Sequence, residues 1–200
     1  MKCIILTGIQ HSGKTTAGKL LAGQTGGVFF DTDKLIEQKT GLSCRELYAQ
    51  KGVEFFKKTE LDACFFLEEY AKYAENKQLT PQSGKTNKTL GAIISTGGGI
   101  CDNPRALSVL ETIGCLAYLH VSEATAFERI CARAKLTGSF PAYIEKLSPE
   151  NDAHRRSIFH GIYEKRTAEY KKRAKLHIDT EGLSPEDVCA ALFSAIQTFE

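Results

Sequence analysis

Residues 8–16 read Gly8-Ile9-Gln10-His11-Ser12-Gly13-Lys14-Thr15-Thr16, and this stretch decides the fold. The residues before it, Cys3 to Thr7, are apolar or β-branched and predict a short buried strand. The residues after it, Ala17 to Ala22, are compatible with a helix that ends at Gly26. A strand, a loop bounded by glycines, a Lys-Thr pair and a helix, in this order, are typical of a loop that binds phosphate.

The chemistry of each position supports a P-loop. Gly8 and Gly13 allow the tight turn that points backbone N–H groups at a polyphosphate. The helix that begins near Lys14 directs the positive end of its dipole at the same point. Lys14 supplies a catalytic charge for the β- and γ-phosphates, and the Thr15 hydroxyl is a ligand for Mg²⁺. The alternative is a strand-to-helix turn that binds nothing. We predict that the nucleotide is bound by Gly8, His11, Ser12, Gly13, Lys14, Thr15 and Thr16.

The composition predicts one globular domain. The chain has 200 residues, of which 42% are hydrophobic and 25% charged, and its net charge is +2. This charge argues against a nucleic-acid or membrane role, and we expect neither a membrane span nor a signal peptide. The 7 cysteines have no C-x-x-C spacing. They predict small buried side chains in a reducing cytoplasm rather than a zinc site or a disulfide framework.

Two further predicted strands end in residues that suit a ligand site. The strand Val28 to Phe30 is followed by Asp31 and Asp33, and the strand at residues 92–95 is followed by Thr96-Gly97-Gly98-Gly99. Ligands gather at the carboxyl ends of parallel strands, where the P-loop also lies. We predict Asp31 near magnesium and Asp33 near a substrate hydroxyl, although either residue also suits a helix N-cap. The three glycines predict a close approach of the backbone to a small ligand, with a flexible turn as the alternative.

A long helix is predicted from Val53 to about Glu75. One stripe of this helix is apolar except for Glu60, and an unpaired charge at such a position is unfavourable. Lys57 lies one turn before Glu60. We therefore predict an ion pair that holds Glu60 towards a cleft, with a solvent-exposed ion pair as the alternative.

The rest of the chain alternates strands and helices. Strands are predicted at residues 115–121 and 176–178, so the expected architecture is a largely parallel sheet covered by helices on both faces. Residues 76–87 are polar and predict a surface loop. Glycines, serines and prolines interrupt the pattern between residues 135 and 157, where a kinase would carry a lid over the phosphates.

With these motifs quoted, the chain resembles the shikimate kinase family over nearly all of its length. After the P-loop come the family's D-x-D at Asp31 and Asp33, a segment at residues 52–60 similar to G-E-x-x-F-R-x-x-E, and T-G-G-G at residues 96–99. The pattern R-x-x-x-Y-x-x-x-A then begins at Arg166. The resemblance implies an α/β P-loop fold of the nucleoside-monophosphate-kinase type, with a five-stranded parallel sheet sandwiched by helices. It implies a single kinase domain over residues 1–200, with a substrate-binding segment at about 33–75 and a mobile lid at about 135–157.

The resemblance also implies the reaction. The γ-phosphate of ATP would be transferred to the 3-hydroxyl of shikimate, a step of aromatic amino acid (chorismate) biosynthesis, with Mg²⁺ as cofactor. The protein would be a cytoplasmic monomer that binds neither nucleic acid nor membrane.

The resemblance assigns roles residue by residue. Asp33 would bind the substrate hydroxyls and accept a proton, and Thr15 and Asp31 would hold Mg²⁺. Arg129 would stack on adenine, with Pro185 against its other face. The substrate would be bound by Asp33, Lys57, Gly97, Gly98, Gly99 and Arg166.

Two departures from the family pattern keep other functions open. Lys57 replaces an arginine that binds carboxylate, and it keeps the charge without the bidentate fork. The lid's R-P-L-L has its nearest counterpart in Phe140-Pro141-Ala142-Tyr143, so the lid arginine is missing, and Lys135, Arg155 or Arg156 could replace it. One alternative is a P-loop kinase for another acceptor, such as gluconate or a nucleotide. The other is a nucleotide-binding regulatory protein that has lost catalysis.

Overall fold

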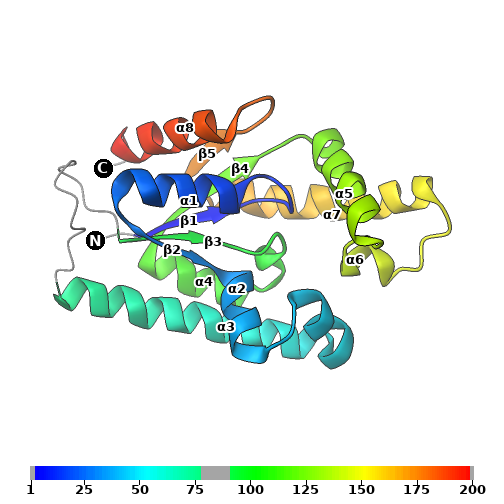
Figure 1. Cartoon of the computed structure of the whole chain (residues 1–200), viewed down its shortest axis with the longest axis horizontal. Coiled ribbons are helices and arrows are strands. Elements are labelled where there is room, and N and C mark those ends of the chain that lie inside the picture. Colours follow the sequence, from blue (N-terminus) through cyan, green and yellow to red (C-terminus); the bar gives the residue numbers. More distant parts are fainter. Residues whose placement is uncertain (1–2, 78–90, 199–200) are drawn as a thin grey trace.

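A sheet of five parallel strands lies at the centre of the computed structural model, which describes residues 3–77 and 91–198 (Figure 1). The strands lie in the order β2-β3-β1-β4-β5, with every pair parallel. This confirms the predicted sheet. Most of the surface loop predicted at residues 76–87 lies outside the described residues. The strands are β1 (Cys3–Thr7), β2 (Val28–Asp31), β3 (Ala92–Ser95), β4 (Gly114–His120) and β5 (Leu176–Asp179).

Helices cover both faces of the sheet because neighbouring residues of a strand point to opposite sides. Leu6 of β1 packs with α1 (Lys14–Thr25) and α8 (Pro185–Thr198). Ile5, its neighbour, packs on the other face with α3 (Cys44–Lys77), α4 (Pro104–Ile113) and α7 (Asp152–Arg173). Leu6 and Ile5 are fully buried. None of the helices that the structure describes is long and apolar enough to cross a membrane.

Polar caps set where α2, α3 and α4 begin. Asp31 caps α2 (Thr32–Thr40), and Ser43 and Glu46 form a reciprocal capping box at the start of α3. Asn103 caps α4 after a single 3₁₀ turn, η1 (Ile100–Asp102). The continuous element α3 is broken at Gly52, whose φ of 80° and ψ of 174° are not helical. Gly52 therefore separates two helices, and the second begins at Val53, where the predicted long helix starts.

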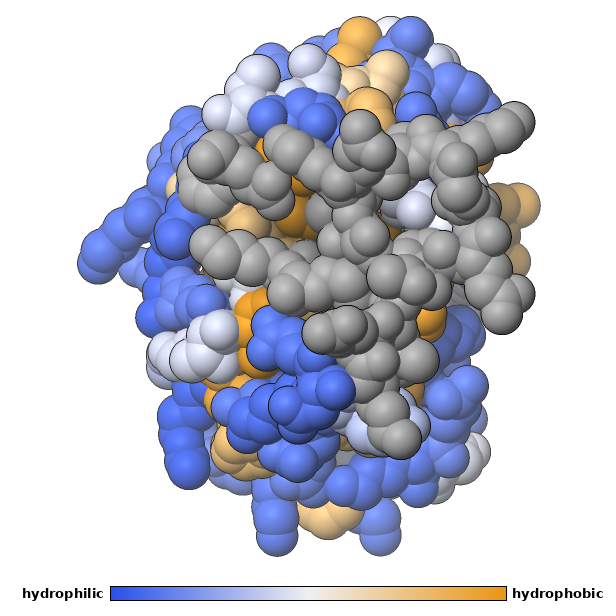
Figure 2. Space-filling model, turned by 90° about the vertical axis from the view of Figure 1, so that its left-hand side faces the viewer, coloured by the Kyte–Doolittle hydropathy of each residue, from blue (hydrophilic) through white to orange (hydrophobic). Residues whose placement is uncertain are grey.

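The helices between β4 and β5 extend beyond the carboxyl ends of the strands (Figure 1). α5 (Glu123–Thr137) leaves β4, and the chain returns through the short α6 (Ala142–Glu145) and the long α7 before it enters β5 (Figure 1). Figure 2 views the opposite end of the molecule, where the visible described side chains are mainly hydrophilic, with apolar ones between them. The ends to which the strands point, where the P-loop follows β1, lie near α5, α6 and α7 (Figure 1).

Candidate active site

A cavity of about 980 Å³ opens at the carboxyl edge of the sheet. Its size is at the upper end of the range for pockets that bind small molecules. Its walls come from the P-loop, α2, α3, the glycine turn after β3, α5, α6 and α7. The structure therefore brings distant parts of the chain together around one space. Among the predicted site residues, those that line it are His11, Thr15, Asp31, Asp33, Lys57, Gly97, Gly98, Gly99 and Arg166.

The P-loop has a backbone that only some residues tolerate. Gly8 has a φ of 145°, and a Cβ atom there would lie 2.5 Å from the carbonyl oxygen of Leu119, so both conformation and space demand glycine. Lys14 curls over the loop and donates from Nζ to the carbonyls of Gly8 (2.9 Å) and Ile9 (2.8 Å). Burial lowers the pKa of Lys14 to about 8, although the nearby carboxylates of Asp33 and Asp31 oppose this shift.

Asp31 is the N-cap of α2 and also contacts the first turn of α1 after the P-loop. Its Oδ1 accepts from the backbone N–H groups of Asp33 (3.1 Å) and Lys34 (3.3 Å), as an N-cap does. Its Oδ2 accepts from Thr15 Oγ1 at 2.8 Å, and Ser95 Oγ lies 3.3 Å from the same hydroxyl. A carboxylate and two hydroxyls thus meet beside the P-loop, and hard oxygen donors of this kind suit Mg²⁺.

Asp33 faces the cavity from the first turn of α2. Asp33 lines the cavity and is partly buried by the surrounding protein. This burial raises the pKa of Asp33 to about 6, and the negative charge of Asp31 adds to the increase, whereas Lys14 opposes it. A carboxylate with such a pKa is ionised at neutral pH and can still accept a proton.

The three glycines after Thr96 each leave room for a different part of the site. A Cβ atom on Gly97 would lie 2.6 Å from Asp33 Oδ1, and one on Gly98 would lie 2.6 Å from the backbone nitrogen of Gln10. A Cβ atom on Gly99 would lie 2.9 Å from Arg166 Nη2. The glycine backbone therefore lies close to α2, the P-loop and α7 and lets these three parts of the protein converge. The predicted approach to a small ligand stays a prediction.

Arg166 reaches the cavity from α7 and is held by a residue that the sequence analysis did not consider. Its Nε and Nη2 both donate to Oδ2 of Asp102, at 3.0 and 2.8 Å, and its Nη1 donates to the carbonyl of Gly98 at 3.2 Å. Burial alone would raise the pKa of Asp102, but the charge of Arg166 and the hydrogen bonds from Arg166 and Lys165 lower it. The only signal in the sequence was an Asp three residues after the glycines.

The predicted ion pair between Lys57 and Glu60 is wrong. Glu60 Oε2 instead accepts from Asn103 Nδ2 at 2.9 Å, and the same amide donates to the backbone carbonyl of Lys57 at 2.8 Å. No ion pair joins Lys57 to Glu60 among the described residues. Burial raises the pKa of Glu60 to about 7, while the hydrogen bond from Asn103 opposes the shift. The amide of Asn103, the N-cap of α4, is the better partner because it can approach the buried carboxyl without bringing a charge.

The predicted nucleotide contacts that do not line the cavity are Gly8, Ser12, Gly13, Lys14, Thr16, Arg129 and Pro185. Arg129 on α5 donates from Nη1 to the carbonyl of His11 at 2.9 Å, so it supports the P-loop backbone. His11 needs such support because its φ of 63° is left-handed. Pro185 is exposed in the first turn of α8. Arg133, one turn after Arg129, does line the cavity, and the spacing of four residues on one helix was the signal for it.

None of the three residues proposed to replace the lid arginine lines the cavity. Arg155 pairs with Asp152 at 2.6 Å and lies over the ring of Phe140, and Arg156 lies over the ring of Phe127. Lys135 is exposed. The guanidinium groups that reach the cavity belong to Arg45, Arg133 and Arg166.

The segment between α5 and α7 lines the cavity with Ser139, Pro141, Ala142 and Tyr143. Arg45, at the start of α3, donates from Nη1 to Ser139 Oγ and to the carbonyl of Phe140, the latter at 2.8 Å. Tyr143 of α6 lines the cavity, and its ring lies over the guanidinium of Arg166, with 4.8 Å between Cζ and the ring centroid. The sequence analysis noted Tyr143 only as part of an altered motif.

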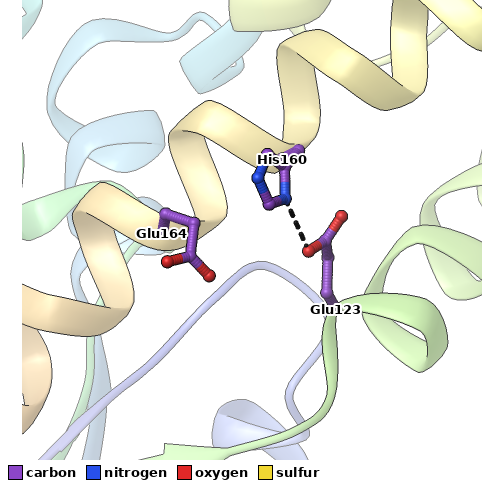
Figure 3. Close-up of side chains that lie close together, drawn as sticks. All are labelled: Glu123, His160 and Glu164. Carbon is purple, nitrogen blue, oxygen red and sulfur yellow. Dashed lines mark hydrogen bonds and ion pairs between the residues drawn. The ribbon is translucent and has the colours of Figure 1, made fainter.

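One further cluster of potential metal ligands lies away from this cavity. Glu123, His160 and Glu164 are the single group of His, Cys, Asp and Glu side chains within the described ranges that could hold one ion (Figure 3). His160 Nδ1 and Glu123 Oε2 are 2.9 Å apart, and the hydrogen bond to this carboxylate raises the pKa of His160. An ion pair on the surface accounts for the arrangement.

Comparisons with known proteins agree with the motifs. A family model described as shikimate kinase matches residues 10–197. The shikimate kinase of Thermodesulfovibrio yellowstonii is 34% identical, over 94% of this chain and 91% of its own. That of Moorella thermoacetica is 29% identical, over 98% and 95%.

Solved structures show the same fold. A shikimate kinase from Acinetobacter baumannii in complex with shikimate superposes with a TM-score of 0.73 at 20% identity and covers 99% of this chain and 94% of its own. A gluconokinase from Sinorhizobium meliloti has a TM-score of 0.55 at 12% identity, with 98% and 92% covered. At these identities the structural likeness establishes the fold and no more.

Proposed function

The chain belongs to the shikimate kinase family, and we propose that it transfers the γ-phosphate of ATP to the 3-hydroxyl of shikimate. The observation that carries this proposal is the meeting of the P-loop, Asp33 and Arg166 around one cavity. The reaction must bring together a triphosphate, a hydroxyl and the carboxylate of the acceptor. Each of these three groups has a suitable protein partner here.

The donor side of the cavity uses the P-loop. Lys14 and the backbone N–H groups of residues 8–16 would bind the phosphates at the start of α1, where the helix dipole favours negative charge. Adenine would lie between Pro185 and the arginines of α5, Arg129 and Arg133. The carbonyls that Lys14 now contacts are weak partners for an ammonium, so a phosphate oxygen would displace them.

Magnesium fits the oxygen donors beside the P-loop. Thr15 Oγ1 and Asp31 Oδ2 are already hydrogen-bonded to each other, and both would hold the ion, directly or through water. When bound, Mg²⁺ neutralises charge on the transferred phosphoryl group.

The acceptor side uses the helical segment of residues 33–75 and α7. Lys57 and Arg166 would bind the carboxylate of shikimate, and Asp33 would orient the 3-hydroxyl. The hydroxyl oxygen forms the new P–O bond, its proton passes to Asp33, and ADP leaves as the bond between the γ-phosphorus and the bridging oxygen breaks. The lid of residues 135–157 would exclude water, so that phosphate is not lost to hydrolysis.

A coupled assay of ADP release tests the proposal. Mg-ATP with shikimate should give ADP, whereas Mg-ATP alone, or with gluconate, should give only a small background. ADP release with gluconate and not with shikimate would instead assign the cavity to another hydroxy acid. Binding of ATP without turnover of either acceptor would indicate a regulatory protein. Light scattering of the same sample tests our expectation of a monomer, and titration with nucleic acid tests our expectation of no binding.

A further inference from the structure

The guanidinium of Arg166 is fixed on more than one side. Asp102 accepts hydrogen bonds from Nε and Nη2, which form one edge of the group, and the carbonyl of Gly98 accepts from Nη1. The ring of Tyr143 covers a face of the same group. The side chain of Arg166 is 10% exposed, and Asp102 is itself anchored by Lys165, whose Nζ lies 3.1 Å from Oδ1. The arrangement restrains the rotation of a long side chain that would otherwise be free to move.

The restraint on the face of Arg166 comes from the lid, whereas the restraint on its edge comes from the body of the protein. Tyr143 lies in α6, and Asp102 lies in η1 at the end of the glycine turn. The lid is in turn held to α3 by the hydrogen bonds from Arg45 and by Lys146, which lies over the ring of Tyr48. The position of the lid is therefore coupled to the orientation of Arg166.

This coupling matters because Lys57 offers only a point charge. The direction in which an acceptor carboxylate is held then depends on a planar guanidinium. A ring stacked on the face of Arg166 leaves its in-plane N–H groups available to carboxylate oxygens. Two of the five N–H groups remain after the bonds to Asp102 and Gly98 are counted.

We propose that Tyr143 is a specificity-determining residue: with Asp102 as a positioning residue, it fixes Arg166 so that the closed lid selects acceptors that carry a carboxylate. The lid thus takes part in recognising the acceptor carboxylate, because the ring of Tyr143 holds the guanidinium that binds it. The inference rests on the proposed function and names the feature of the acceptor that the site selects.

Steady-state kinetics of three lid variants test this role. Tyr143→Ala should raise KM for shikimate about tenfold, the effect of losing a desolvated cation–π contact, with KM for ATP changed less than about twofold. Tyr143→Phe should keep the wild-type KM for shikimate, because the ring of residue 143, not its hydroxyl, contacts Arg166. Leu147→Ala is the matched control, since Leu147 lies in the same segment but is 56% exposed and does not line the cavity.

A neutral acceptor separates recognition of the carboxylate from simple packing. The wild-type protein should prefer shikimate to its methyl ester, and both Tyr143→Ala and Asp102→Asn should reduce this preference about tenfold. Glu111→Gln is the control for Asp102→Asn. Like Asp102, Glu111 is a carboxylate that pairs with an arginine of α7, in this case Arg173. If Tyr143→Ala weakens acid and ester equally, or if Tyr143→Phe fails to restore KM, the inference is wrong.

Calorimetry keeps this inference separate from the proposed function. If shikimate binds to the wild-type protein without being phosphorylated, the proposed function fails. The inference still stands if Tyr143→Ala weakens that binding about tenfold and Tyr143→Phe does not. If shikimate does not bind to the wild-type protein, both proposals are overturned.

Discussion

The pKa of Asp33, the proposed base, is set by burial and by two charged neighbours. Burial raises its pKa, Asp31 raises it further, and Lys14 limits the increase, so the value is about 6. Gly97 leaves room for the carboxylate of Asp33, because a Cβ atom on Gly97 would lie 2.6 Å from Asp33 Oδ1. A residue predicted from its place after a strand therefore lines the cavity and has a pKa that suits the base we propose.

The pH dependence of turnover should report this carboxylate. Because its pKa is raised, Asp33 becomes protonated as the pH falls through about 6, and kcat/KM for shikimate should then fall about tenfold per pH unit. Glu60, with a pKa of about 7, also titrates in this region. The Glu60→Gln variant should retain the acid limb near pH 6. A profile that stays flat down to pH 5 in that variant would exclude Asp33 as the base.

Gly99 should not tolerate a side chain. In Gly99→Ala the new Cβ atom would lie 2.9 Å from Arg166 Nη2, so the guanidinium must move away from the acceptor. We expect KM for shikimate to rise at least about tenfold, with nucleotide binding unchanged. Gly161→Ala on α7 is the control, because nothing lies within 4 Å of its Cβ position and Ala favours a helix by about 1 kcal/mol. Equal kinetics for the two variants would refute the steric argument.

At the scale of elements, Arg45 makes the hydrogen bonds that join the lid to α3, beside the contact of Lys146 with the ring of Tyr48. Removal of this side chain in Arg45→Ala should increase the amide hydrogen exchange of residues 138–148 about fivefold, the effect of losing roughly 1 kcal/mol of hydrogen bonding. Lys39→Ala is the control because it removes an exposed ion pair with Asp62 on the same side of the molecule. Unchanged exchange in the lid of Arg45→Ala would mean that Arg45 does not hold it.

Elements whose signals are local could be predicted from the sequence. The break at Gly52, the capping box at Ser43 and the N-cap at Asn103 each depend on residues within one turn, and all three are present. The partner of Glu60 could not be predicted in this way. Asn103 lies 43 positions away, and only the packing of α4 against α3 brings the two together. The lid posed the same problem, since Arg45 and Phe140 are 95 positions apart.

At the scale of the whole molecule, the strand order explains which site residues were predictable. β2, β3 and β1 are neighbours in the sheet, so the residues that follow them, Asp33, Gly97 and Lys14, necessarily meet at one edge. The rule about strand ends was sufficient for these residues. Asp102, Tyr143 and Arg133 belong to a 3₁₀ turn and to helices beyond the sheet. Their positions follow from tertiary packing, which a single sequence does not reveal.

The two halves of the cavity should stabilise the fold independently. Shikimate at 100 times its Kd should add about 2.7 kcal/mol and raise Tm by about 5 to 10 °C in a chain of this length. A non-hydrolysable ATP analogue with Mg²⁺ should act similarly. Lys14→Ala should lose the shift from the nucleotide but keep the shift from shikimate, whereas Lys19→Ala, on the exposed side of α1, should keep both. Loss of both shifts in Lys14→Ala would indicate a general loss of structure.

The most direct test of the central claim is to identify the product by ³¹P NMR. Wild-type protein with Mg-ATP and shikimate should give ADP and a new phosphate monoester coupled to the proton on C3 of shikimate. Asp33→Asn should bind ATP and form this ester at least about a hundredfold more slowly, while Asp62→Asn, which alters an exposed carboxylate, should match the wild type. An ester at another hydroxyl, or no ester from a protein that binds both substrates, would contradict the assignment of this cavity as a shikimate kinase active site.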